Sequence, residues 1–143
     1  MSTEKAAGSY GFCTGLFVTR KAGGESLIIG GVAEDSTRWT RVLAQRAAQI
    51  IWLQLGKFLF PEQTAEATAF VATAPFRNAD APTITSHAAV DQLENGNYQL
   101  HGWAGEKEWS AHLSEEEAKA FWTVLDKALY PSGLQGKSQQ PGS

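Results

Sequence analysis

The sequence contains a single cysteine, Cys13, among its 143 residues. One thiol cannot form an intramolecular disulfide, and it cannot supply the several thiolates of a cysteine-based metal cluster. Such sparse cysteine usage is typical of a reducing compartment, so we expect a cytoplasmic location. Cys13 itself falls in a strand-like pattern, which favours a small buried side chain over a reactive nucleophile.

Long apolar runs and an excess of basic charge are also missing. No apolar stretch approaches the roughly 20 residues of a membrane-spanning helix, so we expect a soluble chain with no direct membrane insertion. The formal net charge is −3, whereas nucleic-acid binding depends on clustered Lys and Arg side chains. The charge balance therefore favours a protein or small-ligand partner and makes nucleic acid the less favoured one.

Motifs that reveal catalysis by their spacing are absent too. Ser86, His101 and Asp91 could be assembled into a triad, but no G-x-S-x-G elbow accompanies them. The three histidines, which include His87 and His112, lack the H-x-H or H-x-x-x-H spacing of a metal site. We therefore expect a protein that is not an enzyme and that has no cofactor and no metal.

What the sequence does contain begins with a hairpin pattern. Apolar side chains alternate with others between Phe12 and Val18, which is the two-residue period of a strand. The glycine turn at 23–24 can take positive φ, and the segment 25–33 (ESLIIGGVA) reads as a second strand. These two strands are expected to pair.

A long helix is expected next. Asp35 or Ser36 can cap it, and the stretch from Thr37 to about Phe60 has no proline before Pro61 ends the helix. Its apolar residues recur at spacings of three and four, which predicts one buried stripe. The stripe consists of Ala44, Ala47, Ile51, Leu55 and Phe58.

The second half reads as four strands followed by a helix. The strands are expected at 68–76, 83–94, 97–103 and 107–113, with a loop at 78–82. Asn95-Gly96 is a hairpin signal, because a type I′ turn needs positive φ at both central residues. Ser114 and Glu117 match the S-x-x-E capping box, which opens a helix that runs to about Leu129.

An internal repeat appears when the chain is aligned with itself at an offset of 70 residues. Residues 49–61 (QIIWLQLGKFLFP) then lie over residues 119–131 (KAFWTVLDKALYP). The identical pairs are Trp39/Trp109, Leu43/Leu113, Ala48/Ala118, Trp52/Trp122, Leu55/Leu125, Lys57/Lys127, Leu59/Leu129 and Pro61/Pro131. Duplication explains these identities best, and two amphipathic helices under similar packing demands are the alternative.

The expected fold class is α+β: an antiparallel, twisted sheet with two helices, built from a tandem strand-strand-helix repeat. The repeat units are expected at about 10–61 and 66–131 of a single domain, with two strands before the first helix and about four before the second. Residues 1–9 read as a flexible arm. Residues 132–143, rich in Gly, Ser, Gln and Pro, read as a disordered tail.

Strands followed by a helix, given twice, resemble the duplicated topology of Whirly-like single-stranded-DNA-binding regulators. That resemblance implies a DNA-binding sheet, but the lysine-rich strand motif through which Whirly proteins hold DNA has no match in this chain. The stretch 98–131, with its Trp-bearing strands and aromatic-rich helix, is similar to small accessory proteins of cyanobacteria that attach to photosynthetic complexes. Subunit V of the photosynthetic NAD(P)H dehydrogenase-like complex is an example. This second resemblance implies a peripheral position on the cytoplasmic face of a membrane complex.

A basic helix face is the first candidate site. The expected first helix carries four basic residues and no acidic one, and a helical wheel places several of its polar residues on one side. The predicted partner-binding residues are Arg38, Arg41, Gln45, Gln49 and Trp52. Arginine and tryptophan are enriched in interface hot spots, so this face is expected to bind an acidic protein surface. An ordinary solvated face, with Trp52 at the boundary of the core, is the alternative.

Aromatic residues on strands give a second candidate site. Tyr98, Trp103 and Trp109 could stack the bases of a single strand, although aromatic residues also fill cores. Alternation places Trp103 on the face opposite Tyr98, so one of these two is expected to be exposed. The favoured function is a non-enzymatic accessory or assembly protein that docks on a larger protein complex. The alternative is a single-stranded nucleic-acid-binding regulator.

Overall fold

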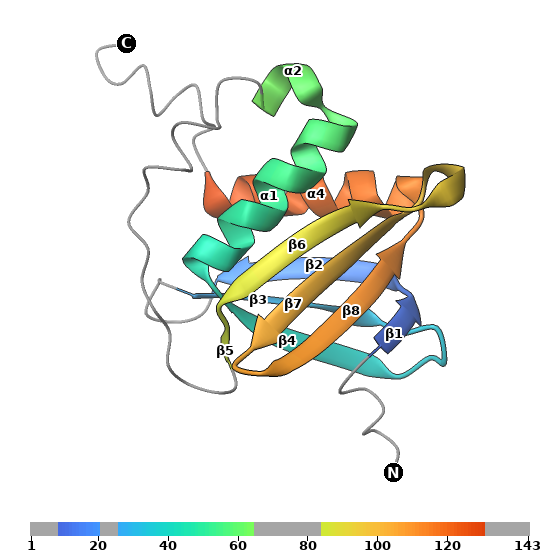
Figure 1. Cartoon of the computed structure of the whole chain (residues 1–143), viewed down its shortest axis with the longest axis vertical. Helices are drawn as coiled ribbons and strands as arrows, with labels where there is room; N and C mark the ends of the chain where they lie inside the picture. Colours follow the sequence, from blue (N-terminus) through green and yellow to red (C-terminus); the bar gives the residue numbers. More distant parts are fainter. Residues whose placement is uncertain (1–8, 21–25, 65–83, 131–143) are drawn as a thin grey trace.

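The computed structural model describes residues 9–20, 26–64 and 84–130 (Figure 1). The strand expected at 68–76, the loop at 78–82 and the tail at 132–143 lie outside these residues, as does the expected arm apart from Ser9. The α+β class is confirmed, with one difference. The strands within these residues form two four-stranded sheets, whereas the sequence predicts one.

The first sheet has the order β2-β3-β4-β5 and the second has the order β1-β8-β7-β6. The first comprises β2 (Thr14–Arg20), β3 (Ser26–Val32), β4 (Arg38–Ala44) and β5 (Ile84–Thr85). The second comprises β1 (Ser9–Phe12), β8 (Lys107–Leu113), β7 (Tyr98–Ala104) and β6 (His87–Gln92). Most neighbours are antiparallel, but β4–β5 and β1–β8 are parallel, so both sheets are mixed.

Among the described residues, the helices that accompany the sheets are α1 (Gln45–Leu59), the short α2 (Pro61–Thr64) and α4 (Glu115–Leu129). Ser114 caps α4 as expected, because its side-chain oxygen accepts a hydrogen bond from the Glu117 N–H at 3.2 Å. Among the described residues, no helix is long and apolar enough to cross a bilayer.

The helix expected from Thr37 begins only at Gln45, so that prediction is wrong for its first eight residues. Residues 38–44 form β4 and pair with β3 along their whole length. Trp39 and Leu43 are buried and alternate with outward-facing residues, which is a strand period. Asp35 caps a turn instead of a helix, since its Oδ1 accepts from the Thr37 N–H at 3.0 Å.

The second half follows the sequence more closely. Strands β7 and β8 and helix α4 lie within one residue of their expected bounds. The strand expected at 83–94 is divided at Ser86 into β5 and β6, which belong to different sheets. Asn95 and Gly96 both have positive φ, 68° and 79°, but the Leu93 N–H donates to the Asn97 carbonyl around a three-residue loop.

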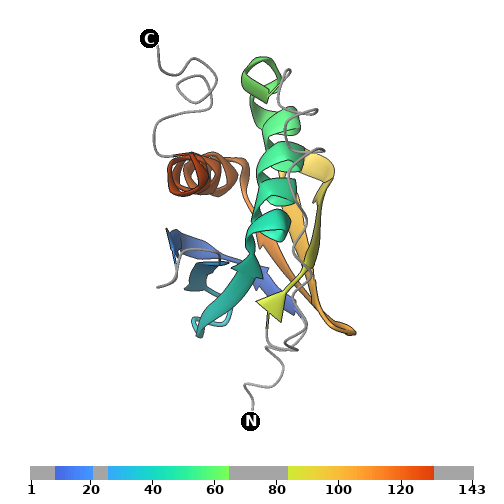
Figure 2. The same cartoon turned by 90° about the vertical axis from the view of Figure 1, so that its left-hand side faces the viewer.

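The repeat is larger than expected and nearly equal in its two units. In the part of the chain that the structure describes, each unit has four strands and then a long helix, β1-β2-β3-β4-α1 and β5-β6-β7-β8-α4, and the helices 45–59 and 115–129 are offset by 70 residues. The units exchange elements: β1 joins the second unit's sheet and β5 joins the first unit's sheet. Helix α1 packs on β6 and α4 packs on β2, so each helix lies along the other unit's edge strand (Figures 1 and 2).

Matched residues of the two units meet in the core. The rings of Trp39 and Trp109 lie 5.8 Å apart between the sheets. Between the helices, the rings of Trp52 and Trp122 stack at 5.7 Å, and the Trp122 Nε1 donates to the Trp52 carbonyl at 2.9 Å. The Trp52 Nε1 donates in turn to Asp126 Oδ1 at 2.8 Å. These contacts explain why tryptophan recurs at the 70-residue offset.

Candidate functional site

The five residues expected on one basic helix face do not form a surface. Arg38 and Arg41 lie on β4, Gln45 is exposed at the start of α1, and Gln49 and Trp52 are only 5% and 1% exposed. The prediction of a shared helix face is therefore wrong. Its physical reason is the change from strand to helix at Gln45, which separates the first two residues from the helical wheel of the others.

The two arginines of β4 point to opposite sides of the first sheet. Arg41 points between the sheets, where its Nε donates to the Tyr10 hydroxyl at 2.7 Å. Its guanidinium also lies 5.6 Å from the Tyr10 ring centre and 5.7 Å from that of Trp109, which is cation–π geometry. Arg41 therefore belongs to the packed interior. Arg38 is exposed on the outer side.

The aromatic residues expected to bind nucleic acid do not form a common platform. Tyr98 and Trp109 are buried, at 4% and 1% exposure, whereas Trp103 is half-buried on the opposite side of β7. The predicted alternation between Tyr98 and Trp103 is confirmed. Trp109 serves the core, since its Nε1 donates to the buried Thr85 hydroxyl at 2.9 Å.

The groups that could carry chemistry are occupied or buried. Cys13 is 1% exposed, as its strand pattern predicts, and burial raises the pKa of its thiol to about 11, which makes it a poor nucleophile. Burial likewise raises the pKa of Tyr130 to about 12. Of the three residues that could be assembled into a triad, His101 contacts Asp91, whereas the Ser86 hydroxyl contacts His87 Nδ1 at 3.1 Å. Within the described ranges, no three His, Cys, Asp or Glu side chains are arranged to hold a metal ion.

The outer side of the first sheet, which we call the first outer face, is largely apolar. Strand register places Thr19, Ile28, Val42 and Ile84 in one cross-strand row, with Phe17, Gly30 and Thr40 in the next and Val32 and Arg38 beyond. Phe17 is 41% exposed, and its ring lies over Gly30, where an added Cβ would come within 2.7 Å of Cζ. None of the described residues in these rows is acidic.

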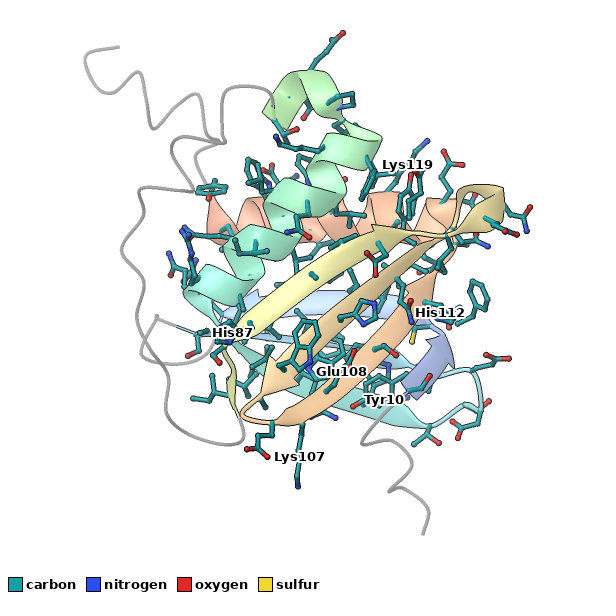
Figure 3. All side chains as sticks on the ribbon, viewed as in Figure 1. Tyr10, His87, Lys107, Glu108, His112 and Lys119 are labelled. Atoms are coloured by element: carbon teal, nitrogen blue, oxygen red, sulfur yellow. The ribbon has the colours of Figure 1, made fainter. Side chains whose placement is uncertain are left out.

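The outer side of the second sheet, the second outer face, is polar. Its three cross-strand rows are His87, Trp103 and Glu108, then Ala89, His101 and Ser110, then Asp91, Gln99 and His112. Figure 3 shows His87, Glu108 and His112 spread across this sheet from β6 to β8. All three histidines, whose spacing in the sequence is not that of a metal site, point to this side.

The repeat makes the two outer faces directly comparable. Some inward residues are identical in the same register: Gly31 pairs with Trp39 across β3 and β4, and Gly102 pairs with Trp109 across β7 and β8. The outward residues differ at each matched position. The matched pairs, first unit before second, are Arg38/Glu108, Thr40/Ser110, Val42/His112, Ile28/Gln99 and Val32/Trp103. The fold therefore tolerates polar residues where the first outer face has apolar ones.

One sequence signal could have revealed the first outer face. The segment LIIGGV of β3 is apolar at consecutive positions, which is the pattern of a strand with both of its faces covered. Leu27 and Ile29 are fully buried, whereas Ile28 and Val32 face outward and stay partly exposed.

Searches against protein-family models and curated proteins found no match to this chain.

Proposed function

We propose that this protein is a non-enzymatic interaction module that docks on a partner protein through the first outer face, in an accessory or assembly role. The observation that carries the proposal is the comparison between the repeat units. Polar residues, Gln99 and His112, occupy the positions of the second sheet that match Ile28 and Val42, so folding does not require Ile28 and Val42 to be apolar. Apolar side chains that the fold does not need, gathered on one exposed face, are typical of a binding surface.

The composition of the face indicates the chemistry of its partner. The rows combine aliphatic and aromatic groups with threonines, and Arg38 supplies the charge at their end. An interface core of this kind fits an apolar surface, and Arg38 pairs with a carboxylate at its rim. Arg38 is the basic residue among the described outward residues that are paired in the two sheets. Single-stranded nucleic acid therefore fits less well, because its backbone is bound by a positively charged groove.

The test is affinity capture of the tagged protein from its native cells, compared between two matched variants. Val42→Glu places a charge in the first outer face, and His112→Glu places the same charge at the corresponding position of the second. We expect Val42→Glu to reduce capture of a defined protein complex by about tenfold or more, as for a hot-spot residue. We expect His112→Glu to leave that capture unchanged, and nuclease treatment to have no effect.

Two results would contradict the proposal. Equal capture by Val42→Glu and the unmodified protein would show that the first outer face does not bind the complex. Loss of the captured components on nuclease treatment would favour the nucleic-acid-binding alternative. Thermal unfolding of both variants, followed by circular dichroism, separates loss of binding from loss of folding.

A further inference from the structure

Charge is divided unevenly between the two repeat units. Among the described residues, the first unit has more basic than acidic side chains, and the second has the reverse. The second unit's acidic residues are Asp91, Glu94, Glu106, Glu108, Glu115, Glu116, Glu117 and Asp126, and its basic residues are Lys107, Lys119 and Lys127. On the strands of the second sheet and the turns that join them, the described acidic residues are Asp91, Glu94, Glu106 and Glu108, against Lys107, so the local field attracts cationic groups.

Three side chains from three strands form a connected diagonal across the rows of the second outer face. The imidazole of His101 lies between two carboxylates, with Nε2 at 3.0 Å from Asp91 Oδ2 and Nδ1 at 2.9 Å from Glu108 Oε2. His101 is 18% exposed, whereas the carboxylate side chains of Asp91 and Glu108 are 64% and 48% exposed. The histidine orients both carboxylates, and both keep surface that a partner can reach.

Trp103 completes this arrangement. Its ring stacks on that of His101 at 5.9 Å with 14° between the planes, and strand register places it between His87 and Glu108. The ring is half-buried and therefore held in place while part of it faces solvent. In the first unit the matched position is Val32, so an indole is not needed there for folding.

We propose that the second outer face binds a basic segment of a protein partner and that it holds an arginine of that segment against Trp103. A guanidinium stacks on an indole and donates hydrogen bonds to carboxylates, and Trp103 and Glu108 offer these two surfaces side by side. Phosphate-bearing ligands are repelled by the same carboxylates. This surface differs in position and chemistry from the first outer face, so the protein would connect two partners.

The probe is a ten-residue peptide with three arginines among glycines and serines, beside a copy with glutamine at each arginine. Binding to ¹⁵N-labelled protein is followed through the indole N–H signals, with the Trp103 signal assigned from Trp103→Phe. We expect the arginine peptide to shift the Trp103 signal in a saturable way and the glutamine peptide to leave it unmoved.

Matched charge variants test the site itself. Glu108→Gln should weaken binding about threefold, the size expected for one exposed ion pair. Glu116→Gln removes the same charge from the exposed surface of α4 and should change binding less than Glu108→Gln does. Val42→Glu, on the first outer face, should keep full peptide binding, so this test does not depend on the docking role proposed above.

Three outcomes would overturn the inference. The first is equal weakening by Glu108→Gln and Glu116→Gln, which would mean general attraction to negative charge. The second is a Trp103 signal that the arginine peptide does not move. The third is a ten-nucleotide thymidine strand that shifts the Trp103 signal more than the arginine peptide does, which would assign this face to nucleic acid.

Discussion

Replacing Gly102 by alanine tests how closely the two sheets are packed around Trp109. A Cβ at this position would lie 2.5 Å from both Cζ2 and Nε1 of the Trp109 ring, and closer still to Cε2. The ring is 1% exposed, and it lies 5.8 Å from the Trp39 ring and 6.3 Å from the Tyr10 ring. Its N–H is bonded to Thr85 Oγ1. The indole therefore cannot retreat without disturbing contacts with both sheets.

The size of the effect follows from this overlap. An ordinary contact with a Cβ is 3.4–4 Å, so the ring or the strand must give by about 1 Å in a close-packed interior. Overpacking of this kind costs about 1–3 kcal/mol, and a rigid ring held on several sides favours the upper end. We expect the free energy of unfolding to fall by about 3 kcal/mol, which lowers Tm by roughly 10 °C for a chain of this length. Urea denaturation followed by circular dichroism measures it.

Two controls separate overpacking from other effects of alanine. Gly105→Ala adds a Cβ with nothing within 4 Å, so its expected cost of about 1 kcal/mol comes from the positive φ of 66° alone. In a Trp109→Leu background the indole is gone, and Gly102→Ala should then cost little. An equal cost of Gly102→Ala in both backgrounds would refute the packing argument, as would a loss below about 1 kcal/mol in the unmodified protein.

Two other predictions concern buried polar groups. Asp126→Ala removes the acceptor of the Trp52 N–H and should lower the free energy of unfolding, measured by urea denaturation, by about 2 kcal/mol. Asp126→Asn keeps an oxygen that can accept this hydrogen bond, so it should retain most of that stability. Equal losses in the two variants would contradict the role of the hydrogen bond. Burial raises the pKa of Cys13 from its ordinary value of 9.0 to about 11, so the stability it contributes is present below pH 9 and is lost as pH rises through 11. Urea denaturation at pH 8 and at pH 11 should show a smaller fall in the free energy of unfolding for Cys13→Ala than for the unmodified protein. Identical falls in the two proteins would contradict the raised pKa.

The second half of the chain could be predicted because its local signals agree. The strand KEWSAHL alternates regularly, a glycine with positive φ precedes it, and Ser114 caps the helix that follows. The prediction for residues 37–44 is wrong because their arginine, leucine and alanine residues favour a helix, and no glycine or proline marks the boundary at Gln45. Pairing with β3, which is a tertiary contact, decides the outcome.

The repeat contained the information to correct this error. At the 70-residue offset, Trp39 aligns with Trp109 and Leu43 aligns with Leu113, and both second-unit residues fall in an expected strand. A residue cannot lie on a helix in one copy of a repeat and on a strand in the other without breaking the equivalence of the copies. The candidate faces were harder to predict, because they depend on the exchange of β1 and β5 between the two sheets.

The packing of each helix on the other unit's edge strand also determines which sheet surfaces stay open. Helix α4 packs on edge strand β2 and α1 packs on edge strand β6, where the side chain of Gln54 accepts a hydrogen bond from the Val90 N–H at 2.8 Å. Covered edges resist the addition of a foreign strand. The outer faces are then the broad sheet surfaces open to a partner, and they are the surfaces at which the two repeat units differ. Identical inward residues such as Trp39 and Trp109 hold the two faces in a fixed relation, whereas the differing outward residues give each face its own surface chemistry.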